Sequence, residues 1–163
     1  MKFIYCPMCG EKLDEKIIGD EGSVPFCVPC KRPHFSFSYP CVIVLVINED
    51  NELALIRQSF VSKNNYICVA GYIKQGETAE LTAKREVEEE LGLEVISVSY
   101  IKSYYYEKRD NLMLGFACKV RKKVFDISSE VDSAVWFAMT EAKSLLRQGS
   151  IGYNLLEDYL NNY

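Results

Sequence analysis

Apolar and polar positions follow regular strand and helix patterns only from about residue 39 onward. Short runs rich in aliphatic and aromatic side chains predict six strands, at 41–47, 53–58, 66–70, 95–106, 112–120 and 135–138. A first helix is predicted from a Thr78 cap to Leu91, before Gly92, and two more at 140–148 and 153–160. Strands that alternate with helices and are joined by hairpins indicate an α/β fold, with a mixed sheet covered by helices.

The residues before this patterned region have a different composition. Residues 1–36 are rich in Cys, Pro, Gly and Lys and show little periodicity. A chain of 163 residues has room for one ordinary domain and a small appended module, but not for two full-sized domains. We therefore expect a small domain at 1–36 and a main domain at 37–163.

Four of the seven cysteines form two Cys-x-x-Cys pairs in the small domain. Cys6 and Cys9 make the first pair, Cys27 and Cys30 make the second, and 17 residues separate the pairs. Four thiolates at this spacing can surround Zn²⁺ as a tetrahedron, the arrangement of a closed structural site. The pattern is similar to a zinc ribbon, and a module this small is expected to need its Zn²⁺ in order to fold.

Two alternatives for the cysteine module remain open. One pair could be a redox dithiol, although such a motif needs to open a helix beside a sheet, and no such pattern surrounds either pair. His34, the only histidine, could replace one thiolate.

The sequence predicts a cytoplasmic protein without membrane association. The number of cysteines is odd, and the amino terminus has no signal-peptide core. No apolar run approaches the roughly 20 residues that a membrane helix needs.

Charge is distributed unevenly along the chain. The net charge is −4, so there is no chain-wide cationic surface, and a nucleic-acid partner is not favoured, although not excluded. The segment 77–94 carries seven glutamates and only two basic residues, Lys84 and Arg85. Such a concentration of one sign repels itself unless cations lie beside it. The segment is therefore the first indication of a divalent metal.

Three of these glutamates share one face of the first predicted helix. At 100° per residue, Glu86, Glu89 and Glu90 fall within an arc of about 100°. Convergent carboxylates suit hard cations such as Mg²⁺ or Mn²⁺, which take oxygen ligands. Arg85 can hold a ligand in one rotamer by pairing with Glu89 or with Glu77. The alternative is a solvated acidic helix with surface ion pairs.

The spacing of these residues favours the metal site. The segment Gly71 to Leu93 reads GYIKQGETAELTAKREVEEELGL. It resembles the Nudix box, G-x5-E-x7-R-E-U-x-E-E-x-G-U with U a bulky aliphatic residue. The matching positions are Gly71, Glu77, Arg85, Glu86, Val87, Glu89, Glu90, Gly92 and Leu93. The resemblance implies a Nudix-type α/β/α sandwich with a mixed sheet, here preceded by a small zinc ribbon.

The resemblance also implies a reaction and the residues that perform it. Nudix enzymes use a divalent metal and water to cleave a diphosphate linkage in nucleoside diphosphate derivatives. Glu86, Glu90 and the carbonyl of Ala70 would hold Mg²⁺ or Mn²⁺, and Glu89 would order or deprotonate the attacking water. Members of the family differ in which carboxylate is the base. The implied catalytic set is Glu89, Glu86 and Arg85.

A further acidic residue follows the predicted sheet residues. Glu130 lies six residues before Trp136, in the segment SSEVDSAVWF. This resembles the Nudix segment in which a distal glutamate completes the metal site ahead of a Trp-Phe strand. Asp132 is the alternative ligand, and a solvated loop without a ligand is the third interpretation.

A zinc ribbon before a Nudix box is similar to the NADH pyrophosphatase branch of the family. That branch carries SQPWPFPxS immediately before a strand like LMLGF, which is 112–116 here. The nine positions 103–111 read SYYYEKRDN, so only Ser103 agrees. The branch also places another domain before the ribbon, with which this chain begins. We expect a shortened relative with its own substrate choice.

Aromatic residues near these positions are candidates for substrate binding. Tyr104 and Tyr106 are expected on the same face of strand 95–106 as Val98 and Tyr100, where one ring could stack on a nucleobase or nicotinamide. Sheet packing is the alternative. By the same resemblance, the candidate substrate contacts are Phe35, Ser103, Tyr104 and Tyr106.

The sequence therefore predicts a metal-dependent hydrolase of a small-molecule nucleotide, with NADH, NAD or a related dinucleotide as substrate. ADP-ribose, FAD, nucleotide sugars and nucleoside triphosphates are alternative substrates, and the resemblance also implies a homodimer. A second class of function is a non-catalytic nucleotide sensor or a zinc-ribbon binding protein. The intact glutamates and the balanced charge of residues 1–36 argue against this class.

Overall fold

The computed structural model describes residues 3–162. The chain divides into two compact units, one ending at Ser38 and one beginning at Tyr39. The predicted boundary after residue 36 falls within the last residues of the first unit. Each unit has its own sheet.

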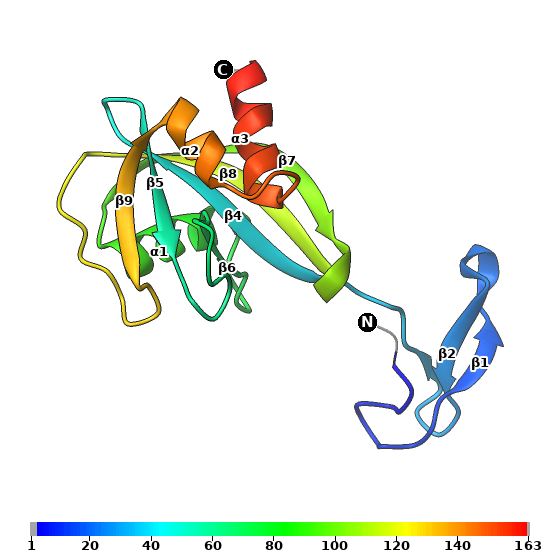
Figure 1. Ribbon diagram of the computed structural model, residues 1–163. Coiled ribbons are helices and arrows are strands. Elements are labelled where there is room, and N and C mark those ends of the chain that lie inside the picture. Colours follow the sequence, from blue (N-terminus) through cyan, green and yellow to red (C-terminus); the bar gives the residue numbers. More distant parts are fainter. Residues whose placement is uncertain (1–2, 163) are drawn as a thin grey trace. The chain divides into compact units, whose positions relative to one another are not determined.

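The first unit is a small antiparallel sheet that the sequence pattern missed. Its strands are β1 (Asp14–Ile17), β2 (Ser23–Cys27) and β3 (Arg32–Pro33), in the order β1-β2-β3, with a 3₁₀ turn at Gly19–Glu21 (Figure 1). All four residues of β1 are exposed, so the alternation of buried and exposed positions that identifies a strand is absent. Cys6, Val24 and Cys27 are among the few buried side chains of this unit, so the cysteines themselves form much of its interior.

The second unit contains a six-stranded mixed sheet. Its strands are β4 (Tyr39–Ile47), β5 (Glu52–Arg57), β6 (Val69–Tyr72), β7 (Val95–Tyr106), β8 (Asn111–Val120) and β9 (Ser133–Ala138). The order is β7-β8-β4-β5-β9, and β6 pairs with β4. β4 and β8 are parallel and the remaining pairs are antiparallel, which confirms the predicted mixed sheet.

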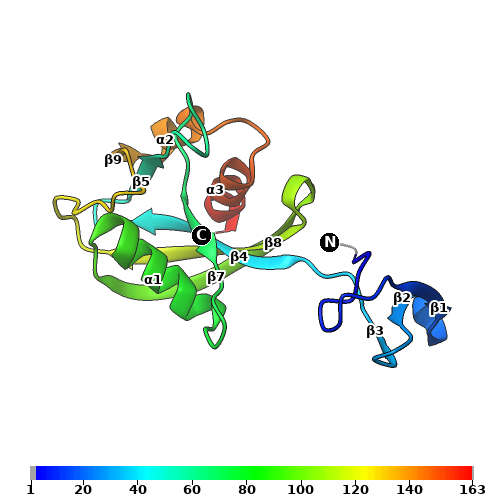
Figure 2. The same ribbon diagram turned by 90° about the horizontal axis from the view of Figure 1, so that it is seen from below.

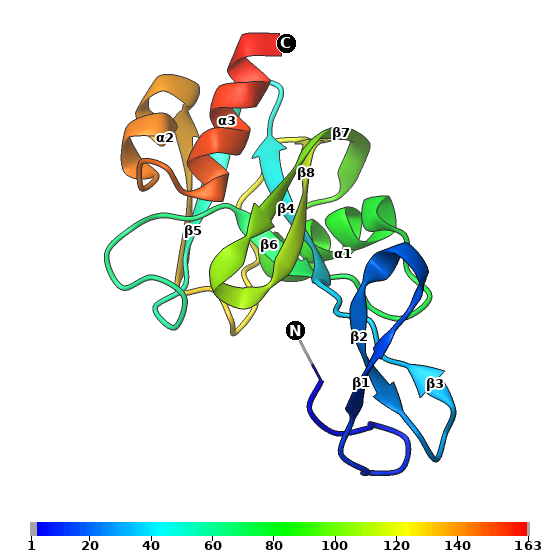
Figure 3. The same cartoon turned by 90° about the vertical axis from the view of Figure 1, so that its right-hand side faces the viewer.

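Helices cover both faces of this sheet. Helix α1 (Ala79–Leu91) packs on one face, and α2 (Met139–Leu145) and α3 (Ile151–Asn162) pack on the other (Figures 2 and 3). Because β4 is central, Val42 and Val44 contact the α1 layer while Ile43 and Leu45 contact the α2/α3 layer. This explains the unbroken apolar run of β4 and confirms the predicted α/β/α sandwich. Among residues 3–162, no helix is long and apolar enough to cross a membrane.

The ends of α1 agree with the predicted caps. The Thr78 hydroxyl accepts a hydrogen bond from the Leu81 amide at 3.3 Å. Gly92 is left-handed, with φ of 66°, and its amide donates to the Glu88 carbonyl. By contrast, α2 ends at Leu145, earlier than predicted, because Leu146 turns to an extended conformation and pairs with Tyr66.

The register of β7 corrects one prediction. Tyr100 pairs with Phe116 of the α1 layer, but a bulge follows, and Tyr104 pairs with Met113 of the α2/α3 layer. An inserted residue moves every later side chain to the opposite face. Tyr104 and Tyr106 therefore do not share a face with Val98 and Tyr100, as the simple alternation predicted; they pack on the α2/α3 side.

Candidate active site

The glutamate cluster lies where α1 crosses β6. The carboxylate of Glu86 lies against the backbone of Gly71, such that a Cβ added at Gly71 would be 2.0 Å from Glu86 Cδ. Only glycine leaves this space for a carboxylate. The Gly71 of the predicted motif therefore seats a ligand candidate rather than forming a turn, since its φ is not positive.

Arg85 connects three carboxylates of the cluster. Its Nε and Nη2 donate to the two oxygens of Glu77 at 2.7 and 2.9 Å. Its Nη1 donates to Glu86 Oε1 at 2.6 Å and to Glu89 Oε2 at 2.9 Å, and Nη2 also reaches the Tyr72 carbonyl at 3.2 Å. The guanidinium hydrogen bonds lower the pKa of Glu77 to about 2. Both predicted pairings of Arg85 are thus present, together with a third to Glu86.

Glu90 is the most deeply buried carboxylate of the cluster, with 5% of its surface exposed. Its Oε1 accepts a hydrogen bond from Gln58 Nε2 at 3.2 Å, but Oε2 has no hydrogen-bond partner among residues 3–162. Burial, together with the negative charges of Glu86 and Glu130, raises the pKa of Glu90 to about 7. A buried carboxylate oxygen without a partner is destabilising unless a cation or a proton satisfies it.

The donors of this cluster fit a hard divalent cation. Glu86 and Glu90 supply partly or fully buried oxygen atoms, and burial raises the pKa of Glu86 against the opposing effect of Arg85. Carboxylate oxygens are the ligands that Mg²⁺ and Mn²⁺ prefer. The unpartnered Glu90 Oε2 and the seat at Gly71 are therefore consistent with metal binding by Glu86 and Glu90.

Glu89 differs from its two neighbours in exposure. Its side chain is 54% exposed and lies between Arg85 Nη1 and Lys74 Nζ, which is 3.9 Å from Oε1. A carboxylate in this position is accessible to water while two cationic groups hold it in place. The location suits a residue that orders or deprotonates water, as the sequence predicts, whereas Glu86 and Glu90 are better placed as ligands.

Glu130 and Asp132 lie in one loop but face different partners. The loop that carries Glu130 is bonded to α1 at Glu90, whose carbonyl accepts from the Ser128 amide at 3.3 Å, and the negative charge of Glu130 contributes to the raised pKa of Glu90. Asp132 Oδ2 instead accepts a hydrogen bond from the Ser59 amide at 2.6 Å. The Asp132 carboxylate is thus engaged by a backbone amide, and the role of Glu130 as the additional ligand remains a prediction. Ala70 precedes Gly71 in β6 and is exposed, and its role remains a prediction.

The four paired cysteines of the first unit come together. The sulfur atoms of Cys6, Cys9, Cys27 and Cys30 all lie within 4.8 Å of one another. Four sulfurs about 2.3 Å from one Zn²⁺ would be separated by about 3.8 Å, so a small adjustment satisfies a tetrahedral site. His34 Nε2 is 3.5 Å from Cys6 Sγ and lies outside a set that is already complete.

The thiols of this cluster share their protons unequally. Burial opposes ionisation of Cys6, but the backbone amides of Met8 and Cys9 outweigh it and lower the pKa of Cys6 to about 6. The neighbouring thiols of Cys9 and Cys27 raise the pKa of Cys30 to about 12. Four sulfurs this close cannot all be thiolates without a cation, which a Zn²⁺ ion would supply. The other three cysteines are buried free thiols in the second unit.

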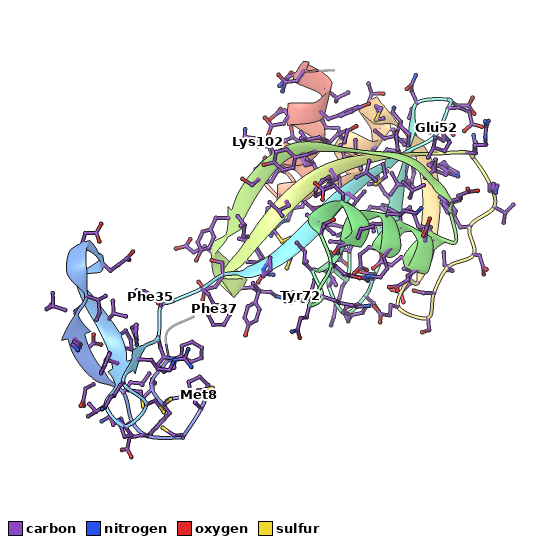
Figure 4. All side chains as sticks on the ribbon, turned by 180° about the vertical axis from the view of Figure 1, so that it is seen from behind. Met8, Phe35, Phe37, Glu52, Tyr72 and Lys102 are labelled. Carbon is purple, nitrogen blue, oxygen red and sulfur yellow. The ribbon has the colours of Figure 1, made fainter. Side chains whose placement is uncertain are left out.

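The candidate substrate contacts do not form one group. Ser103 pairs with Leu114 of the α1 layer and is exposed on the glutamate side of the sheet. Tyr104 instead donates from its hydroxyl to Asp158 of α3 at 2.7 Å, which fits the packing alternative. Figure 4 shows the neighbouring Lys102, also paired with Asp158, beside α3. Phe35 is half exposed in the first unit, and its substrate role remains a prediction.

Sequence reasoning missed Gln58, which contacts the glutamate cluster. The predicted strand 53–58 ends at Gln58, whereas β5 ends at Arg57 and Gln58 follows it, with 6% of its surface exposed. An amide at the end of a strand whose central residues, Leu53 to Ile56, are all apolar is the signal that could have identified it, because a buried amide needs a polar partner.

Substitution of Gly71 provides a test of the metal seat. In Gly71→Ala the new methyl group would displace the Glu86 carboxylate, whose flexible end can rotate away without unfolding the sheet. We expect the affinity for Mn²⁺, measured by calorimetry, to fall at least about tenfold. Circular dichroism should show an unchanged fold. Mn²⁺ binding equal to that of the unsubstituted protein would exclude Glu86 as a ligand.

A mixed sheet between helices, with an arginine-clamped glutamate cluster on the first helix, defines a Nudix domain. The NUDIX domain model matches residues 38–159, and the chain belongs to this family.

The relatives and solved structures that match extend beyond this domain. The NAD-capped RNA hydrolase NudC of Pseudomonas aeruginosa is 32% identical over 96% of this chain and 55% of its own length. That of Vibrio atlanticus is 28% identical over 97% and 58%, so the chain spans just over half of these relatives. A crystal structure of a Nudix hydrolase from Nitrosomonas europaea has the same fold, with a TM-score of 0.74 and 20% identity, over 99% of this chain and 91% of that one.

Proposed function

We propose that this protein is a metal-dependent hydrolase that cleaves the diphosphate linkage of an NAD-like dinucleotide into two phosphate-bearing products. The observation that carries the proposal is the buried Glu90 carboxylate, with one oxygen held by Gln58 and the other without a partner. Membership of the Nudix family and similarity to NudC proteins over nearly the whole chain support the same conclusion.

Each residue of the cluster has a distinct part in this proposal. Glu86, Glu90, Glu130 and the Ala70 carbonyl would hold Mg²⁺ or Mn²⁺, and the bound ion would supply positive charge for phosphate oxygens and would lower the pKa of a bound water. Glu89 accepts a proton from the attacking water, because it is exposed and fixed by Arg85. Arg85 keeps Glu86 and Glu89 in fixed rotamers through one guanidinium nitrogen.

In this proposal the first unit has a structural role and the second unit is catalytic. Residues 1–36 form a zinc ribbon whose Zn²⁺ is held by Cys6, Cys9, Cys27 and Cys30, and residues 37–163 form the catalytic domain. Two observations support this division. The four-sulfur cluster lies within the first unit, and the two hydrophobic clusters of the second unit are formed by its own residues. A cytoplasmic location is part of this proposal, because seven cysteines without a disulfide suit a reducing compartment.

The relatives are the basis for the substrate class, because residues 103–111 differ from the SQPWPFPxS motif at every position except Ser103. The NudC relatives are named as NAD-capped RNA hydrolases. The NAD moiety is common to free NAD and to capped RNA, and the net charge of −4 favours the free dinucleotide. ADP-ribose, FAD, nucleotide sugars and nucleoside triphosphates are the competing small substrates.

A mass-spectrometric screen tests this function directly. The full chain is incubated with Mg²⁺ or Mn²⁺ and each candidate, with NAD-capped and triphosphate RNA as separate arms. We expect NAD or NADH to yield two mononucleotides and Glu89→Gln to lower the rate by at least about a hundredfold. Turnover of none of these substrates, together with nucleotide binding, would indicate a sensor instead. Light scattering in the same preparation tests the implied homodimer.

A further inference from the structure

We propose that Gln58 and Asp132 are positioning residues that align the two halves of the metal site, one on α1 and one on the loop that carries Glu130. The inference rests on the metal-binding role proposed for Glu90. Neither residue belongs to the nine positions of the box motif, and neither is proposed to touch the substrate.

Gln58 acts on Glu90 through a single hydrogen bond. Its side-chain nitrogen donates to Glu90 Oε1 at 3.2 Å, and both residues are at least nine-tenths buried. An amide nitrogen is only a donor, so this contact occupies one oxygen of the carboxylate and leaves Oε2 without a partner. Gln58 thereby selects the oxygen that is presented to a cation, and it fixes the rotamer of Glu90.

Asp132 fixes the segment that carries Glu130 to the segment that carries Gln58. Its Oδ2 accepts from the Ser59 amide at 2.6 Å, and its own amide donates to the Arg57 carbonyl at 2.8 Å. These two bonds lie on either side of Gln58 in the chain. They anchor the start of β9 to the end of β5.

The same loop is also bonded to the end of α1. The Ser128 amide donates to the Glu90 carbonyl at 3.3 Å, and the Asp126 amide donates to the Leu91 carbonyl at 3.0 Å. Glu130 therefore lies between one anchor on α1 and one on β5. Because Glu130 lies two residues from each anchor, a shift of either anchor would move its carboxylate relative to Glu90.

The role of Gln58 is tested by measuring the binding of Mn²⁺ to the metal-free protein. Gln58→Met keeps the volume but removes the donor, and we expect the Mn²⁺ affinity from calorimetry to fall between about 10-fold and 100-fold. If Gln58 acts through Glu90, adding Gln58→Met to Glu90→Gln should cause less than about a twofold further loss. Asp158→Asn, on the opposite face of the sheet, is the matched control and should bind Mn²⁺ normally.

The Asp132 half makes a different prediction, because an anchor needs an acceptor oxygen and a ligand needs a charge. Asp132→Asn retains an oxygen for the Ser59 amide and should bind Mn²⁺ within about threefold of the unsubstituted protein, whereas Asp132→Ala should lose about tenfold. Equal losses in both variants would show that Asp132 is a ligand and would overturn its role as an anchor.

A measurement on the unsubstituted protein covers the case in which Gln58→Met does not fold. The side-chain amide signals of Gln58 should shift during an Mg²⁺ titration with the same midpoint as the calorimetric binding. An unmoved Gln58 signal, or normal Mn²⁺ affinity in Gln58→Met, would overturn the proposal. Tight metal binding without any turnover would contradict only the proposed function, and absence of metal binding would contradict both.

Discussion

Glu90→Gln is expected to lower kcat/KM by roughly 10³-fold, or about 4 kcal/mol of transition-state stabilisation, while the fold remains intact. The substitution is nearly isosteric and its oxygen can still accept the hydrogen bond of Gln58. What is lost is the negative charge at the oxygen that has no other partner. Steady-state rates on the substrate found by the screen measure the effect.

The same substitution should stabilise the metal-free protein above neutral pH. The folded pKa of Glu90 is about 7 against 4.5 for the free side chain, so between these values the unfolded chain releases its proton first. The contribution of Glu90 to stability therefore falls as the pH rises from about 4.5 to 7. Metal-free Glu90→Gln should exceed the unsubstituted protein by up to about 3 kcal/mol at pH 8, with no difference near pH 4.

A matched control distinguishes this site from general loss of acidic charge. Glu88 lies on the same helix, two residues away, but its carboxylate pairs with Lys84 at 3.6 Å and is not among the carboxylates that Arg85 binds. Glu88→Gln should leave kcat/KM unchanged. If Glu88→Gln is as inactive as Glu90→Gln, or Glu90→Gln is as active as the unsubstituted protein, the site assignment is wrong.

The part of the site that lies on α1, including Glu90, could be predicted from the sequence. The helix, its Thr78 and Gly92 caps and its glutamate face could be predicted because each depends on residues within one or two turns. The buried apolar run of β4 could also be predicted, because a strand between two helical layers has no polar side. Local periodicity therefore accounts for the layers of the fold and for the carboxylates of the site.

Features that depend on pairing between distant segments could not be predicted in this way. The bulge that moves Tyr104 to the α2/α3 face is a property of the β7 register with β8, and no residue of β7 signals it. Gln58 is 32 positions from Glu90 in sequence, and only the fold brings them together. The hydrogen bond from the Ser59 amide to Asp132 likewise joins residues 73 positions apart, which only the fold brings together.

Removal of Zn²⁺ is expected to unfold the first unit and leave the second folded. Few apolar side chains are buried in the first unit, and two of them, Cys6 and Cys27, belong to the four-sulfur cluster. Metal coordination at such sites contributes about 10–16 kcal/mol, far more than so small a core can supply. The clusters that stabilise the second unit are formed by its own residues, from Cys41 onward.

Cys27→Ser tests this separation with a single atom. We expect the zinc content to fall from about one ion per chain to near zero, and the amide signals of the first unit to collapse to the narrow dispersion of an unfolded segment. The thermal transition of the second unit should persist. Cys41→Ala removes a buried thiol outside the cluster and should retain its zinc. A folded first unit without zinc would mean that its strands, and not the metal, determine its structure.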